Sequence, residues 1–152
     1  RLYGLETVSL RYFNVFGPRQ DPKSPYSGVV SRFLDSIRTG TAPTIHGDGE
    51  QTRDFTYIEN VAEANFAACH EAAASGGVFN IGCGERISIN ELWTTMAELA
   101  GSPLEAQHGP IRAGDVPHSL ADIGAAKAAF SYDPKVALNE GLRRTLGFYG
   151  LM

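Results

Sequence analysis

The chain reads TVSLRYFNVFGPRQ over residues 7–20, and this stretch decides the fold class. Its first six residues are rich in β-branched and aromatic side chains, which predicts a strand. From Phe13 to Gly28 the sequence holds three prolines and two glycines and reads as a long irregular loop. Loops of this length inside a domain are uncommon and are often functional. We therefore expect a strand that leads into a functional loop.

Outward from this stretch, helical and extended patterns alternate along the chain. Ser88 and Glu91 form a capping-box pattern ahead of a helix, and glycines follow most of the helical segments. Five helices are expected, at 29–38, 60–74, about 90–100, 122–130, and from the cap Asp133 and Pro134 to about Tyr149. Short strands are expected at 44–46, 54–58, 78–81 and 104–107. This pattern is typical of an α/β protein.

Two of the expected strands, Val8–Tyr12 and Val78–Ile81, lack the alternation of a half-exposed strand. Continuous apolar character is typical of parallel strands that are buried on both faces. No long series of strand–helix–strand repeats accompanies them, so we expect their sheet partners to lie outside this chain. Strands without partners have free edges and an uncovered apolar face. We therefore expect the chain to self-associate through these strands.

The composition is that of an ordinary globular chain and excludes several classes of function. The 152 residues, 43% hydrophobic and 20% charged, match one domain and argue against disorder. A net charge of −4 argues against nucleic-acid binding, because phosphate backbones require a basic face. No apolar run is long enough for a membrane span, and no signal-peptide pattern opens the sequence. The cysteines and histidines show no disulfide or metal-ligand spacing, which favours a reducing cytoplasm and no metal site.

Four segments carry a more specific signal because they occur together and in order. They are Arg11–Gln20, His46–Phe55, Phe79–Gly82 and Arg112–Pro117. In sequence and spacing these segments resemble the NAD-dependent nucleotide-sugar epimerases and dehydratases, which are extended short-chain dehydrogenases. The resemblance covers essentially the whole chain and is UDP-glucose 4-epimerase-like.

Two features of that family are missing from this sequence. In the family, a Rossmann domain binds NAD through a Gly-x-x-Gly-x-x-Gly turn, and a Tyr-x-x-x-Lys pair works beside the nicotinamide. Here the stretch from Gly82 to Gly84 is too short for such a turn, and no tyrosine has a lysine four residues later. The resemblance therefore implies that residues 1–152 are the C-terminal substrate-binding portion, a small α/β domain plus strands that normally complete a Rossmann sheet. With the N-terminal NAD-binding domain absent, we expect no NAD to bind this chain alone.

The chemistry of a nucleotide sugar favours particular side chains as ligands. Guanidinium groups suit a diphosphate because their planar fork makes charge-assisted hydrogen bonds, and Arg53 and Arg112 lie in or beside polar loops. Asn14 offers an amide in the loop after a strand, and Asp115 can accept hydrogen bonds from ribose hydroxyls. The resemblance implies the same roles, with Asn14, Arg53 and Arg112 on the diphosphate and Asp115 on the ribose.

The resemblance also implies a base-binding wall and one cofactor contact. Thr44 and His46 alternate on one face of a strand, and with Val29 they would border the uracil. His46 departs from the aromatic residue often found there, although an imidazole can still stack. Tyr12 would lie near the nicotinamide if a cofactor domain were present.

Several of these side chains also have ordinary structural interpretations. Asn14 is a common turn residue that bonds its own backbone, and Arg112 could pair with Asp115 across a turn. Cys69, in an alanine-rich helix, is expected to be a small buried side chain. Instead of binding a ligand, Arg53 could form an ion pair with the neighbouring carboxylate of Asp48, Glu50 or Asp54.

Three functional hypotheses follow. In the first, the chain binds the nucleotide of a UDP-hexose as part of an epimerase. In that family, NAD removes a hydride from C4 of the sugar and returns it to the other face. The chain alone is expected to be inactive. The second keeps the family and changes the reaction to 4,6-dehydration or decarboxylation of a nucleotide sugar. The third is of another class, a stand-alone nucleotide-binding module or an inert fragment.

Overall fold

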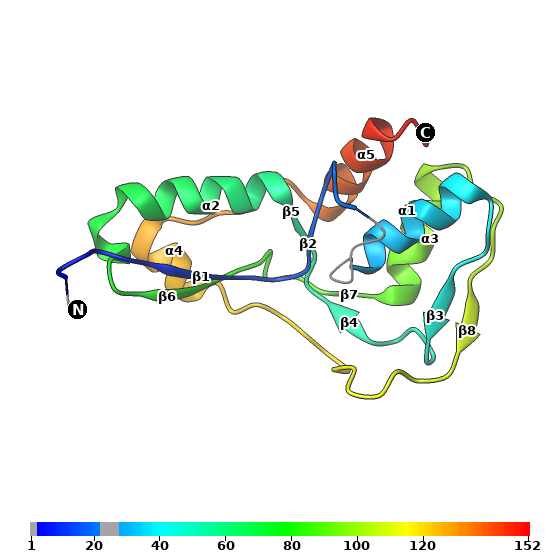
Figure 1. Ribbon diagram of the computed structural model, residues 1–152, viewed down its shortest axis with the longest axis horizontal. Coiled ribbons are helices and arrows are strands. Elements are labelled where there is room, and N and C mark those ends of the chain that lie inside the picture. Colours follow the sequence, from blue (N-terminus) through cyan, green and yellow to red (C-terminus); the bar gives the residue numbers. More distant parts are fainter. Residues whose placement is uncertain (1–2, 22–27) are drawn as a thin grey trace.

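The computed structural model describes residues 3–21 and 28–152 and shows an elongated chain with two packed regions (Figure 1). Each region has its own cluster of buried side chains. We call the region around the paired strands β1 (Ser9–Tyr12) and β6 (Val78–Ile81) the sheet lobe. We call the other region the helical lobe. It is built around the three helices α1 (Val29–Thr39), α3 (Ile89–Leu99) and α5 (Leu138–Phe148).

The sheet lobe is a parallel pair of strands covered by short alanine-rich elements. Leu10 of β1 lies opposite Phe79 of β6, and Phe79 meets Phe130 edge to face with 5.1 Å between ring centroids. Ala64 and Ala68 lie one turn apart and are buried, so their small side chains let the helix approach the strands closely. These covering elements are α2 (Ile58–His70), the 3₁₀ turn η1 (Ala72–Ala74) and α4 (Gly124–Phe130).

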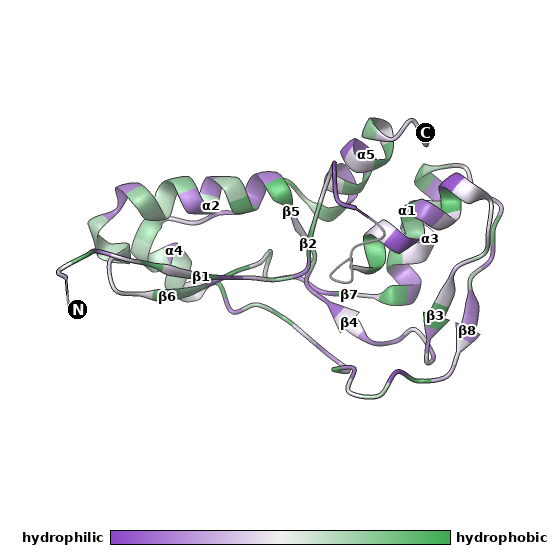
Figure 2. Cartoon of the chain, viewed as in Figure 1, coloured by the Kyte–Doolittle hydropathy of each residue, from purple (hydrophilic) through white to green (hydrophobic). Residues whose placement is uncertain are grey.

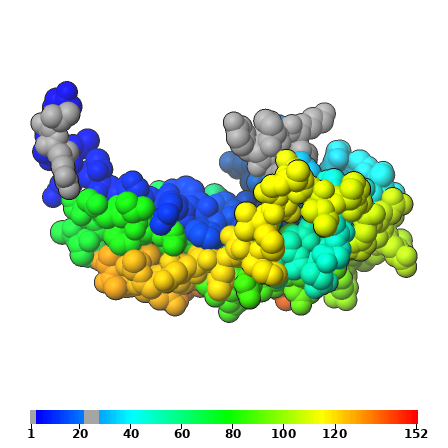
Figure 3. All heavy atoms as spheres, turned by 90° about the horizontal axis from the view of Figure 1, so that it is seen from below, coloured from blue at the N-terminus to red at the C-terminus, as the bar shows by residue number. Residues whose placement is uncertain are grey.

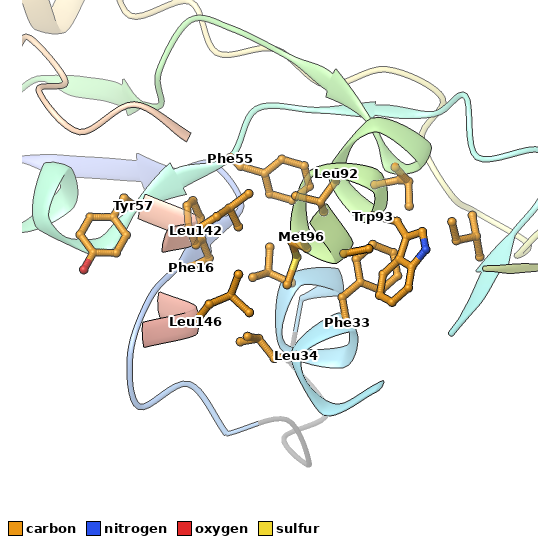
Figure 4. Close-up of a cluster of buried hydrophobic side chains, with 14 of the residues drawn as sticks. Phe16, Phe33, Leu34, Phe55, Tyr57, Leu92, Trp93, Met96, Leu142 and Leu146 are labelled. Atoms are coloured by element: carbon orange, nitrogen blue, oxygen red, sulfur yellow. The ribbon is translucent and has the colours of Figure 1, made fainter. Parts of the chain in front are cut away.

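The helical lobe has a core of larger aromatic and aliphatic side chains (Figure 4). Phe33 of α1 and Trp93 of α3 meet edge to face, with ring centroids 5.1 Å apart. Leu142 and Leu146 lie one turn apart on α5 and are fully buried. Burial of side chains of this size contributes about 1.5–3 kcal/mol each to folding. The hydropathy colouring in Figure 2 shows hydrophobic and hydrophilic segments alternating along these helices.

Three further strand pairs connect these parts of the chain. β3 (Thr44–His46) pairs in parallel with β8 (Gln107–Gly109) at the end of the helical lobe. β4 (Thr52–Arg53) pairs antiparallel with β7 (Ile87–Ser88), and β2 (Val15–Phe16) pairs in parallel with β5 (Thr56–Tyr57). Every sheet among the described residues is therefore two-stranded.

A buried carboxylate ties the two lobes together. Asp54, between β4 and β5, is fully buried, and its carboxylate accepts hydrogen bonds from the backbone N–H groups of Cys83 (2.8 Å), Gly84 (2.9 Å) and Ala121 (3.2 Å). At Gly82, a Cβ atom would lie 2.4 Å from the Ala121 Cβ and 2.8 Å from Asp54 Oδ2. Only glycine fits there, because any side chain would displace this network.

Several predicted elements are confirmed. The helix predicted at 29–38 is α1, and Gly40 ends it in the left-handed conformation with φ 68°. The strands predicted at 44–46 and 78–81 are β3 and β6. Both halves of the predicted capping box at Ser88 and Glu91 are present at the start of α3. The helix predicted at 122–130 is α4, which begins two residues later.

Other predicted boundaries are wrong, for local reasons. The strand predicted at 54–58 is shorter, because only Thr56 and Tyr57 form β5 and Ile58 already begins α2. The last helix begins at Leu138 and not at Pro134, because the N–H groups of Lys135 and Val136 donate to Asn60 Oδ1 and hold an irregular loop. The helix predicted at 60–74 spans Ile58–His70 as α2, since Glu71 is extended. The strand predicted at 104–107 lies at Gln107–Gly109.

Two expectations about loops and burial also need correction. The loop predicted from Phe13 to Gly28 contains β2, and its residues 22–27 lie outside the described part of the chain. The strands predicted at Val8–Tyr12 and Val78–Ile81 lie at β1 and β6 and pair in parallel with each other, although their sheet partners were expected outside this chain, and the expected burial on both faces is wrong. β1 is largely exposed, and Val78 of β6 is 56% exposed. None of the helices in the described residues is both long and apolar enough to cross a membrane.

Candidate functional site

A cavity of about 450 Å³ opens between α1, β3 and the loop around residues 112–115. Its lining includes every residue that the sequence analysis proposed for the substrate: Asn14, Val29, Thr44, His46, Arg53, Arg112 and Asp115. These residues come from five separate segments, so only the folded chain brings them together. Their roles toward a ligand stay predictions.

Local geometry explains how the walls of this cavity are built. Ile45 is buried between Thr44 and His46, so strand alternation turns both neighbours to the opposite, exposed face. Val29 begins α1 and borders the same cavity. Asn14 follows β1 with φ 32° in the left-handed region, which asparagine tolerates better than most residues, and its amide donates to the Asp54 carbonyl at 3.0 Å. Its bond therefore goes to a distant segment and not to its own backbone.

The shortest polar contact in the cavity joins two of the predicted ligands. Arg53 Nη2 lies 2.5 Å from Asp115 Oδ1, and the two side chains are only 14% and 35% exposed. The sequence had left Asp48, Glu50 and Asp54 as possible partners of Arg53, and Arg112 as a possible partner of Asp115. Both alternatives are wrong, since Arg112 and Asp115 meet only through a backbone hydrogen bond of 3.2 Å. Asp48 instead accepts the Glu50 N–H, as expected of a turn residue.

The segment that carries Arg112 and Asp115 lies across the cavity and is fastened to β4. Thr52 N–H donates to the Pro117 carbonyl at 2.9 Å, and Ser119 N–H donates to the Thr52 carbonyl at 3.0 Å. The Thr52 hydroxyl also lies 3.0 Å from His118 Nδ1. Figure 3 shows this segment in yellow, lying on the surface against the cyan spheres of the β3 region. The wall formed by residues 112–115 is therefore held to the strand that carries Arg53.

The cavity is cationic although the chain is acidic. Its lining holds three arginines and one carboxylate, Asp115, so it carries two net positive charges with His46 neutral, on a chain whose net charge is −4. The sequence analysis did not single out the third arginine, Arg32. Arg32 lies three residues after Val29 on α1, and that helical spacing was the signal that could have placed it on the same face. Such a concentration of guanidinium groups favours an anion.

Tyr12 is the predicted site residue that the structure places elsewhere. It is 48% exposed on β1, it lies outside the lining of the cavity, and its hydroxyl donates to Asn65 Oδ1 at 2.9 Å. The predicted contact with a nicotinamide stays a prediction.

The turn after β6 does not offer free backbone N–H groups to the phosphates of a dinucleotide cofactor. The glycine-containing turn after β6 is the place where a parallel strand could present free backbone N–H groups. Here the N–H groups of Cys83 and Gly84 already donate to Asp54. Burial raises the pKa of Asp54, and the backbone hydrogen bonds oppose that rise. The turn is thus filled by the protein's own carboxylate, and we assign no step of chemistry to a cofactor on this chain.

Cys83 does not have the surroundings of a catalytic nucleophile. Burial raises the pKa of the Cys83 thiol to about 11, and its Sγ lies 3.3 Å from the Phe55 carbonyl, which disfavours the reactive thiolate. Cys69 is exposed, so the prediction of a buried side chain there is wrong. Among the described residues, no group of three or more His, Cys, Asp or Glu side chains is placed to hold a metal.

An α/β chain with a cationic open cavity is the kind of protein that binds an anionic small molecule. Comparison with known proteins makes this specific. The model of the NAD dependent epimerase/dehydratase family matches residues 1–82. The chain therefore belongs to the NAD dependent epimerase/dehydratase family.

Individual relatives agree in sequence and in fold. A putative UDP-glucose 4-epimerase of Methanocaldococcus jannaschii is 40% identical over 148 residues, which are 97% of this chain and 47% of that protein. A UDP-glucose 4-epimerase of Thermotoga maritima, solved with UDP-glucose, is 40% identical with a TM-score of 0.92 over 97% of this chain and 47% of that one. A Thermus thermophilus UDP-glucose 4-epimerase, solved with NAD, is 38% identical with a TM-score of 0.87 over 99% of this chain and 49% of that one. The chain thus spans about half the length of the relatives it matches.

Proposed function

We propose that this chain is the C-terminal, nucleotide-sugar-binding portion of an NAD-dependent epimerase that acts on a UDP-hexose. The observation that carries the proposal is the cationic cavity, which gathers all seven of the predicted substrate residues. Two net positive charges suit the two negative charges of a diphosphate. The solved relative from Thermotoga maritima was determined with UDP-glucose, which supports the choice of ligand.

Within this proposal each wall of the cavity has a chemical task. Arg53, Arg112 and Asn14 donate to the diphosphate, and Asp115 accepts from the ribose hydroxyls. The wall of Thr44, His46 and Val29 borders the base. Binding energy from this remote end of the substrate holds the sugar in place for reaction.

The reaction itself belongs to the full-length protein in this proposal. A domain outside this chain would hold NAD, which would supply the oxidation and reduction at C4 of the sugar, and Tyr12 would lie near the nicotinamide. A turnover assay of the 152-residue chain with UDP-galactose and NAD should give no product. Measurable turnover by this chain would contradict the proposal.

Calorimetry with UDP and UDP-glucose tests the binding site directly. We expect micromolar binding, and we expect Arg112→Ala to weaken it by about 10-fold or more, because a charge-assisted hydrogen bond contributes about 1.5–3 kcal/mol. Arg38→Ala is the matched control, since Arg38 is exposed on α1, pairs with Asp35 and lies outside the cavity. No binding at millimolar UDP would instead support the inert-fragment hypothesis.

A second reaction has support from a named relative. A UDP-N-acetyl-alpha-D-glucosaminuronate decarboxylase of Bacillus cytotoxicus is 32% identical over 154 residues. A decarboxylase of this family would bind the same nucleotide part of its substrate, so the cavity fits this function too. Product analysis with a full-length protein carrying this chain separates the two, because epimerisation keeps every carbon of the sugar and decarboxylation releases carbon dioxide.

We also propose that the 152-residue chain self-associates through the sheet lobe. The exposed face and edge of β1 and β6, with Val78 56% and Tyr12 48% exposed, offer unpaired backbone groups and apolar surface. Light scattering should give a mass that rises above 16.4 kDa as the concentration increases. A constant monomer mass at high concentration would contradict this proposal.

A further inference from the structure

The cavity has a polar end and a far end, and the chain path defines both. Gln51 Nε2 donates to the His46 carbonyl at 2.8 Å, so the C-terminal end of β3 lies near β4 and Arg53. The opposite end of β3 follows a short connection from α1, in which Thr41 N–H donates to the Ser36 carbonyl at 3.1 Å. Ser36 and Pro43 therefore mark the end of the cavity that lies away from the Arg53–Asp115 pair.

Arg32 faces the cavity between these two ends. Val29, Arg32, Phe33 and Ser36 all line the cavity, and their spacing places them on one face of α1. Arg32 lies about one turn, roughly 5.4 Å along the helix axis, from both Val29 and Ser36. A ligand whose diphosphate occupies the polar end would extend its base toward Arg32.

The donors of Arg32 are free for a ligand. In the part of the chain that the structure describes, the Arg32 side chain takes part in no hydrogen bond or ion pair. The one carboxylate in the lining, Asp115, is already bonded to Arg53 at 2.5 Å. A guanidinium has five N–H donors and no acceptor, so the ligand group that Arg32 meets must supply acceptor atoms.

We infer that Arg32 selects the base of the nucleotide by donating to the 4-carbonyl of a keto pyrimidine. This inference rests on the proposed function, because it takes the ligand to be a nucleoside diphosphate. Uracil and thymine carry a carbonyl acceptor at position 4, whereas cytosine carries an amino group there, whose N–H donors would face the donors of Arg32. Arg32 is thus a specificity-determining residue that favours UDP over CDP.

Calorimetry with three probes tests this role: UDP, CDP and inorganic pyrophosphate. The wild-type chain should prefer UDP over CDP by about 10-fold or more, the range expected of one hydrogen-bonded base contact. Arg32→Gln, whose amide both donates and accepts, should bring the UDP-to-CDP ratio close to one and leave pyrophosphate binding unchanged. Arg32→Met should weaken UDP without weakening CDP. Arg38→Gln, on the same helix and outside the cavity, is the control and should keep the wild-type ratio.

The outcomes separate this inference from the proposed function. A wild-type ratio that survives in Arg32→Gln overturns the inference and leaves UDP binding, and so the proposed function, in place. An equal loss for UDP, CDP and pyrophosphate in Arg32→Gln also overturns it, because Arg32 would then contact phosphate. No UDP binding by the wild-type chain overturns both. Circular dichroism of each variant should match the wild type, since Arg32 is exposed and makes no hydrogen bond or ion pair within residues 3–21 and 28–152.

Discussion

The two lobes of this chain differ in how completely they enclose their own surfaces. In the helical lobe, three helices pack around Phe33, Trp93 and Leu142, and this lobe forms most of the cavity wall. The sheet lobe buries mainly small side chains and leaves one face of β1 exposed. A binding site can therefore be assembled from short strands and loops around a well-packed helical core, without a continuous sheet. The two lobes depend on one another through the junction at Asp54.

The largest effect should come from breaking that junction. Asp54→Ala removes the acceptor of three backbone N–H groups, those of Cys83, Gly84 and Ala121. An unsatisfied donor costs about 1–3 kcal/mol when it is buried. Because the Ala121 bond is buried and the other two are only part-buried, we expect a loss of about 3–6 kcal/mol in the free energy of unfolding, measured by urea denaturation. The control Asp48→Ala removes an exposed carboxylate with one turn contact and should cost less than about 1 kcal/mol. Equal losses in the two variants would show that Asp54 does not join the lobes.

A smaller effect should follow from crowding the helical lobe where it meets β2 and β5. Gly141 lies on the buried side of α5, and a Cβ there would lie 2.9 Å from Phe16 Cζ and 3.0 Å from Tyr57 Cβ. Gly141→Ala should therefore cost about 1–3 kcal/mol by overpacking, measured in the same denaturation assay.

Gly147→Ala is the matched control on the same helix. A Cβ at Gly147 would meet only Met152 Sδ, at 3.9 Å, which is ordinary contact. Alanine is the better helix former by up to about 1 kcal/mol, so this variant should be neutral or stabilised. Destabilisation of both variants to the same extent would mean that helix α5 does not pack as described.

The smallest effect is a difference in thiol reactivity between the surface of the sheet lobe and the junction. Cys69 is exposed on α2, while the pKa of Cys83 is raised to about 11. At pH 8 only about one thousandth of such a thiol is thiolate, so an aromatic disulfide reagent should modify one thiol quickly in the native chain and both in denaturant. The Cys69→Ser variant should lose the fast phase. Two equally fast thiols in the native wild type would contradict the difference.

Local patterns in the sequence predicted the parts of the fold that local interactions set. The apolar spacing after Gly28, the capping box at Ser88 and the left-handed stop at Gly40 each depend on residues within one or two turns. The start of the last helix could not be predicted in this way. It depends on Asn60, whose side-chain oxygen accepts a hydrogen bond from the Lys135 N–H, 75 residues further along the chain.

The candidate site shows the same division. The polar residues of the cavity could be proposed from chemistry and from the resemblance to a family, and the fold brings them together. The partner of Arg53 could not be proposed, because Asp115 lies 62 residues away and closer acids offered simpler pairings. Arg32 was missed for a different reason, since an arginine on an amphipathic helix is usually an exposed surface residue with no ligand.

The Arg53–Asp115 pair has a consequence for the ionic strength at which the site works. Because Asp115 already neutralises Arg53 in the described structure, and Arg32 is assigned to the base, an incoming diphosphate meets one uncompensated guanidinium group, that of Arg112. Diphosphate affinity should then decline with added salt as for one engaged charge, while Arg53 exchanges one oxygen partner for another inside a half-buried, weakly screened setting. The ion pair therefore makes the site less sensitive to salt than its arginine content suggests.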